Sequence, residues 1–69
     1  MHKVRKHIVK AIEATMARQA ELRAEVEELD ILEITEDEAH MRLMCIRAEQ
    51  QSAEDTLYHL RVALAHIPA

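Results

Sequence analysis

The residue types that could carry chemistry are five histidines, one cysteine and thirteen acidic residues, in a chain of 69. Metal binding is not indicated, because the chain has no HExxH pair and Cys45 lacks the cysteine or histidine spacing of a zinc site. Catalysis is not indicated either. Neither Cys45 nor Ser52 has a histidine at helical spacing to activate it, and a chain without glycine has no glycine-rich phosphate loop. The sequence therefore predicts neither an enzyme nor a metal or cofactor site.

The carboxylates gather in one stretch, which suggests recognition of another protein. Residues 21–38 carry nine acidic side chains against one arginine, Arg23. Closely spaced carboxylates on a rigid tip can oppose a basic surface and compete with phosphates for it. A natural target would be the basic DNA-binding domain of a transcription factor. The candidate partner-binding residues join these charges to nearby apolar side chains, and they are Glu27, Glu28, Asp30, Ile31, Glu33, Ile34, Glu36, Asp37, Glu38, Met41 and Met44.

The acidic stretch contains a helix start. A hydroxyl residue at Thr35 and a glutamate three positions later at Glu38 have the spacing of a capping box. Glycine is absent and the only proline is Pro68, a composition that favours long helices and disfavours sheet. We therefore expect a single all-α domain over residues 1–69, with a helix at about 3–32, a turn at about 33–35 and a second helix at about 36–66.

Each predicted helix carries an apolar series that steps by three and four residues, as in a coiled-coil seam. The first series is Ile8, Ile12, Thr15, Gln19, Leu22, Val26 and Leu29, and the second is Ala39, Leu43, Ile46, Gln50, Ala53, Leu57, Leu60, Leu64 and Ile67. The two frames do not join into one helix, because the first would place Glu33 and Glu36 on the seam. The chain should therefore fold back as an antiparallel hairpin, with Leu22 near Ile46, Ile12 near Leu57 and a polar Gln19–Gln50 layer at mid-seam.

A second apolar side indicates that the hairpin is not alone. Away from its seam the second helix carries Met41, Met44, Cys45 and Ala48, and further along Tyr58, Val62 and Ala65. A helix that is apolar on two sides is normally buried on two sides. A homodimer that forms a four-helix bundle is the plain explanation, and a groove for a different protein is the alternative.

The surroundings of the chain also follow from composition. One cysteine cannot form an internal disulfide and suits a reducing compartment. The longest apolar runs are too short for a signal peptide or a membrane span, so we expect a cytoplasmic protein and no membrane partner.

Two other functions stay open. The start of the chain is basic, with Lys3, Arg5, Lys6 and Lys10, and could contact phosphates of a nucleic acid. Against this reading, the net charge is −4 and the chain has one aromatic residue, Tyr58. A plain oligomerisation module without a partner is the other alternative.

In its length, its two-helix build and the segment ILEITEDE at residues 31–38, the chain resembles small bacteriophage anti-activators that inhibit quorum sensing in Pseudomonas. The resemblance implies a dimeric helical protein in the cytoplasm of the infected host. It implies binding to the DNA-binding domain of a LuxR-type activator similar to LasR, which blocks attachment to promoters. It also implies inhibition of the type IV pilus assembly ATPase. No binding residue is carried over from these proteins.

Overall fold

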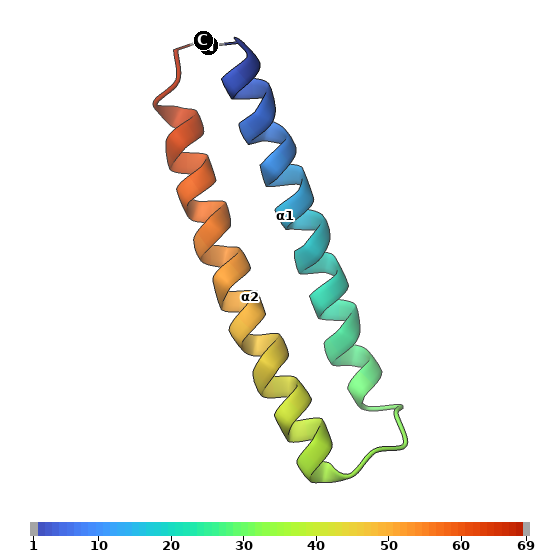
Figure 1. The fold of residues 1–69 in the computed structure, drawn as a ribbon. Helices are drawn as coiled ribbons and strands as arrows, with labels where there is room; N and C mark the ends of the chain where they lie inside the picture. The colour runs from blue at the N-terminus through green and yellow to red at the C-terminus, as the bar shows by residue number, and fades with distance from the viewer. Residues whose placement is uncertain (1, 69) are drawn as a thin grey trace.

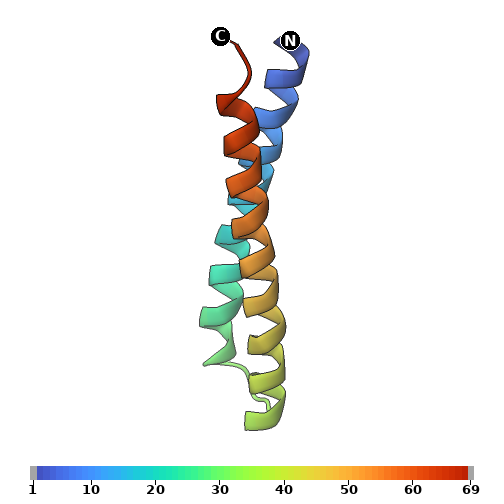
Figure 2. The same cartoon turned by 90° about the vertical axis from the view of Figure 1, so that its left-hand side faces the viewer.

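The computed structural model describes the backbone of residues 2–68 and the side chains of residues 3–68, and over this range the chain is an all-α helical hairpin. Helix α1 spans His2–Leu29 and helix α2 spans Glu36–Ala65. They lie antiparallel and are joined by a loop at residues 30–35 (Figure 1). The rod measures 51 × 15 × 12 Å, and from the side the helices cross at a shallow angle (Figure 2). The predicted all-α antiparallel hairpin is confirmed.

The start of α2 is fixed by Thr35. Its backbone is extended, with φ −70° and ψ 160°, and its hydroxyl oxygen accepts a hydrogen bond from the Glu38 backbone N–H at 3.1 Å. The Ala39 backbone N–H donates to the Thr35 carbonyl at 2.9 Å, which begins the helical ladder. Acidic residues fill the first turn of α2, where the positive end of the helix dipole favours them. The helix start expected from the capping-box spacing is therefore present.

Both helices end before their expected positions, α1 by three residues and α2 by one. Helix α1 ends at Leu29, three residues before the expected end, and the Ile31 backbone N–H closes the last turn on the Glu28 carbonyl at 3.1 Å. At the end of α2, the His66 backbone N–H donates to the Ala63 carbonyl at 3.2 Å, and His66 Nδ1 lies 2.8 Å from the Val62 carbonyl oxygen. Because that oxygen can only accept, Nδ1 must carry the proton there. His66 therefore caps α2 through both backbone and side chain.

The core is the predicted seam. Every position of both apolar series is buried or half-buried, and Leu22 and Leu57 are the most enclosed, with 1% and 7% of their surface exposed. The Thr15 hydroxyl is satisfied by the Ala11 carbonyl at 2.8 Å. The Gln50 side-chain oxygen accepts from Arg47 on its own helix at 3.0 Å, so the expected Gln19–Gln50 layer is half-buried but Gln50 is bonded within α2.

A two-helix core leaves much apolar surface uncovered. Eight large apolar side chains are exposed among the described residues, and they are Val4, Met16, Ile31, Leu32, Met41, Met44, Tyr58 and Val62. Neither α1 nor α2 is both long enough and apolar enough to cross a membrane. Small single-core chains usually need a metal, a disulfide or an associated chain for stability. The exposed side chains are therefore the first places to look for function.

Candidate protein-binding surface at the turn

The carboxylates predicted to bind a partner lie at one end of the rod. The loop at residues 30–35 joins the last turn of α1 to the first turn of α2, so all of these side chains surround the tip seen in Figure 1. Each of them is exposed: Glu27, Glu28, Asp30, Glu33, Glu36, Asp37 and Glu38. We call this group the acidic turn. It lies about half a rod length or more from the basic residues at the start of α1.

The predicted apolar contacts differ in exposure and in their distance from the groove beside the turn. Ile31 lies in the loop with 80% of its surface exposed, which is the largest value among the large apolar residues. Ile34 is a half-buried residue of the loop and is less available to a partner. Met41 and Met44 are both exposed on α2 and point to the same side of the helix, about 60° apart, but of the two only Met41 lines the groove described next. Ile31 and Met41 are therefore the best placed of the predicted anchors.

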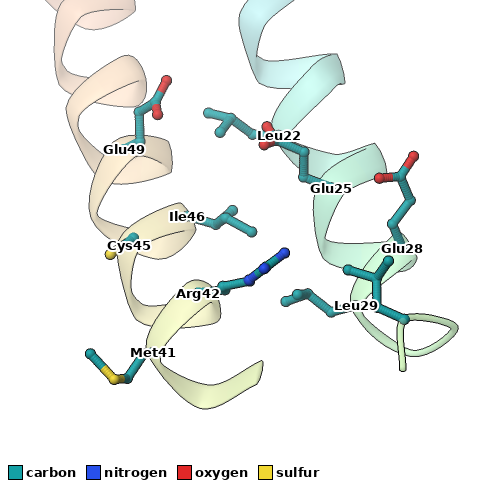
Figure 3. A pocket seen from close by; sticks show the side chains of 10 residues that line it. Leu22, Glu25, Glu28, Leu29, Met41, Arg42, Cys45, Ile46 and Glu49 are labelled. Atoms are coloured by element: carbon teal, nitrogen blue, oxygen red, sulfur yellow. The ribbon is translucent and has the colours of Figure 1, made fainter. Parts of the chain in front are cut away.

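A groove of about 380 Å³ opens between the helices next to the acidic turn. Figure 3 shows Ile46 and Arg42 from α2 and Leu29 from α1 pointing into the space between the helices, whereas Met41 and Cys45 point away from α1. Its lining is apolar in the middle and charged at the rim, and consists of Leu22, Glu25, Glu28, Leu29, Leu32, Met41, Arg42, Cys45, Ile46 and Glu49. The rim carries three carboxylates and one guanidinium, that of Arg42, and two of the carboxylates, Glu25 and Glu49, are bonded to Arg18. The rim is therefore acidic on balance and suits an apolar side chain beside a cation.

Sequence reasoning missed most of this groove. It named only Glu28 and Met41, because it weighed the charge of the turn and the seam separately. Leu29 was placed on the seam, and Leu32 was placed inside α1, although Leu32 lies in the loop and is exposed. The sequence did contain a pattern that indicates the groove. Leu22, Leu29 and Ile46 are apolar seam residues next to charged edge positions, and a hollow can form where two helices separate toward the loop that joins them.

Arg18 joins the two helices at the upper end of the groove. Its guanidinium donates two hydrogen bonds to the Glu49 carboxylate, from Nε to Oε2 at 2.5 Å and from Nη2 to Oε1 at 3.0 Å. The same side chain bonds Glu21 at 2.9 Å and Glu25 at 3.3 Å on its own helix. We call these four residues the Arg18 cluster. A two-bond fork fixes direction as well as distance, so the cluster holds the helices in register.

The Arg18 cluster also perturbs titration. The hydrogen bond from Arg18 holds the pKa of the Glu49 carboxyl below its ordinary value of 4.5, and the bonds to Glu49 and Glu21 raise the pKa of Arg18. Glu49 lines the groove and also a second, shallower hollow of about 300 Å³ further along the rod. That hollow is formed by small and polar side chains, namely Ala14, Thr15, Arg18, Glu49, Ser52, Ala53 and Thr56. Glu49 therefore stays ionised at the wall between two hollows.

The opposite end of the rod carries the opposite charge. Lys3, Arg5, Lys6 and Lys10 on α1 and Arg61 on α2 are all exposed there. Among residues 3–68, no group of three or more histidine, cysteine or acidic side chains has the arrangement of a metal site. Acidic residues therefore predominate at the turn and basic residues at the open end, although Arg42 lies close to the turn, on the rim of the groove.

No protein-family model, no curated protein and no solved structure matches the chain at a significant level. The charge, exposure and shape of the hairpin's own surfaces therefore carry the functional inference.

Proposed function

We propose that this chain is a protein-binding inhibitor whose acidic turn and adjoining groove cover the basic, DNA-contacting surface of a bacterial transcription activator. One observation carries the proposal. An apolar groove of about 380 Å³ lies beside seven exposed carboxylates at the same end of a rigid hairpin. Surfaces of this kind fit a partner that presents an apolar side chain among arginines and lysines.

The mechanism is competition for a basic surface. A DNA-binding domain holds its cations where phosphates will lie, and the exposed carboxylates of the acidic turn can pair with the same cations. Ile31 and Leu32, both exposed in the loop, supply apolar contact that does not weaken with salt. Helical walls on both sides keep these groups ordered before binding, so little conformational entropy is lost when the complex forms.

The partner class follows from the sequence resemblance. The first candidate is the DNA-binding domain of a LuxR-type quorum-sensing activator similar to LasR, and the second is the type IV pilus assembly ATPase. The polarised rod supports any basic partner surface, so the choice between these two rests on measurement. Binding of the activator domain should release DNA, whereas binding of the ATPase should lower ATP hydrolysis.

The test is charge reversal at the turn. Glu27→Lys with Glu28→Lys should weaken binding to the purified activator domain at least tenfold, because two attractive contacts become repulsive. The matched control is Glu13→Lys with Glu54→Lys, which changes net charge equally at exposed positions away from the turn. Affinity is measured by calorimetry, with displacement of promoter DNA as a second readout. If both double variants bind as the parent does, the acidic turn is not the binding surface.

The basic open end supports one rival function, binding to a nucleic acid. Lys3, Arg5, Lys6 and Lys10 are exposed on the first turns of α1. That function predicts a complex with RNA or DNA whose affinity falls steeply with salt and with Lys6→Glu plus Lys10→Glu. A protein that binds nucleic acid in this way and shows no affinity for the activator domain would replace the proposal above.

A further inference from the structure

Helix α2 carries a second heptad-spaced stripe on the side turned away from α1. Its eight positions alternate between steps of three and four residues, and all are exposed: Met41, Met44, Ala48, Gln51, Asp55, Tyr58, Val62 and Ala65. We call this set the outer stripe. Met44 and Tyr58 have 59% and 65% of their surface exposed, and Met41 points away from α1 in Figure 3. Steps of three and four are the spacing by which one helix packs along another.

The outer stripe is symmetric about the level of Ala53. Ala48 and Tyr58 lie five residues on either side of this level, and Met44 and Val62 lie nine residues on either side. When two copies of a helix pack antiparallel about a two-fold axis, positions at equal distances on opposite sides of the axis meet. Tyr58 of one copy would therefore meet the small Ala48 of the other, and Met44 would meet Val62. The stripe is complementary to a second copy of itself in that orientation.

The middle of the stripe is polar in a complementary way. Gln51 and Asp55 lie two residues on either side of the same level, and Gln51 Nε2 donates to Asp55 Oδ1 at 3.1 Å within the chain. An amide nitrogen has a second hydrogen to donate, and a carboxylate oxygen can accept further bonds. About the two-fold axis, Gln51 of each copy meets Asp55 of the other. A polar layer at the centre of an apolar seam sets register and orientation.

Charge at the ends of the rod favours the same orientation. An antiparallel pair brings the acidic turn of one copy to the end of the other that carries Arg61 and the basic start of α1. A parallel pair would bring two acidic turns together, and like charges within about 10 Å repel at ordinary ionic strength. Apolar pattern, polar centre and end charges therefore agree on one occupant.

We propose that the outer stripe binds a second copy of this chain in antiparallel orientation, with the two-fold axis at the level of Ala53. This inference is independent of the activator and of any other partner. It assigns Met44 to the contact between copies and leaves Ile31, Leu32 and the groove between the helices for a different protein. Met41, which lies at the end of the stripe and on the rim of the groove, is shared by the two surfaces.

The test is disulfide cross-linking between two single-cysteine chains, both with Cys45→Ser. One chain carries Met44→Cys, the other carries Val62→Cys, and they are mixed under mild oxidation. Antiparallel packing should yield mostly the mixed disulfide, because Met44 of one copy faces Val62 of the other. The matched control pairs Val62→Cys with Ala24→Cys, an exposed position on α1, and should give little product. Products are separated by mass.

Two results would overturn the proposal. Predominant linkage of each chain to its own kind would show parallel packing, and a monomer mass in solution at about 100 µM would show that the stripe is free. A substitution at an exposed position of α2 separates loss of the dimer from loss of the hairpin fold. Ala48→Glu should return the protein to monomer mass while helicity is kept, because Ala48 faces away from α1, whereas Ala24→Glu should stay dimeric. A dimeric Ala48→Glu variant would also refute the outer stripe as the contact.

Discussion

The two faces of α2 have the same three-and-four spacing of residues, but they differ in burial. The inner face, with Leu43, Leu57 and Leu64, is covered by α1, and Leu57 is 7% exposed. The adjacent Tyr58 belongs to the outer stripe and is 65% exposed. Both faces have polar residues at mid-length, Gln50 on the inner face and the Gln51–Asp55 pair on the outer one. Heptad spacing thus predicts that a face can pack against another helix. Within this chain only the inner face of α2 has such a helix beside it, and only that face is buried.

Truncation of one residue on each face is expected to show the largest difference between them. Leu57→Ala should cost about 2–5 kcal/mol of unfolding free energy, because it empties the best enclosed part of a small core. Tyr58→Ala is the matched change on the outer face. It should cost less per hairpin and should mainly reduce the dependence of the melting temperature on protein concentration. Both effects are read from thermal unfolding by circular dichroism at several concentrations.

Equal losses for the two variants, with the same dependence on concentration, would contradict the distinction between an intrachain face and an interchain face. A larger loss for Tyr58→Ala would indicate that contact between copies, and not the hairpin seam, is the main source of stability. The Leu57→Ala protein must be checked at low temperature, since a core of two well-buried leucines leaves little margin.

The glutamine layer in the middle of the inner seam is the next feature to test. Gln19→Leu with Gln50→Leu should raise the unfolding free energy by about 2 kcal/mol, since two half-buried polar side chains are replaced by apolar ones. The same change should loosen the register, because an all-apolar seam allows neighbouring alignments. Thermal unfolding measures the first effect and backbone amide line widths measure the second. A lower melting temperature would show that the glutamine layer stabilises the hairpin beyond setting its register.

Features of the fold that depend on local sequence patterns could be predicted, and features that depend on the distance between the helices could not. The seams, the helix start at Thr35 and the antiparallel fold were predictable, because three-and-four spacing and a capping hydroxyl act locally. The end of α1 was not, since no glycine or proline marks it and the chain leaves the helix at Asp30. The groove and the Arg18 cluster depend on how closely two helices approach, which spacing does not specify. Arg18 and Glu49 each precede a seam glutamine, Gln19 and Gln50, and that shared position was the clue to their pairing.

The smallest expected effect concerns the edge of the inner seam, where Arg18 lowers the pKa of Glu49. A carboxyl whose pKa is lower in the folded than in the unfolded chain stabilises the fold above the unfolded value, ordinarily 4.5. That stabilisation is lost as the pH falls from there through the lowered pKa of the folded state. Glu49→Gln should therefore reduce stability at neutral pH and remove this part of the loss in acid. Both residues are exposed, so the change in melting temperature should be slight.

A double-mutant cycle isolates the contribution of the Arg18–Glu49 pair from that of the other acidic residues. Melting temperatures of the parent, Arg18→Gln, Glu49→Gln and the double variant are compared at pH 7 and at about pH 3. The coupling between Arg18 and Glu49 should be smaller at the lower pH, because it is lost as the pH falls through the lowered pKa of Glu49, and Glu54→Gln serves as a control for loss of an exposed charge. A coupling of equal size at both pH values would mean that the fork stabilises the hairpin by packing and not by charge. The inner seam would then be held together by shape along its edge as well as in its middle.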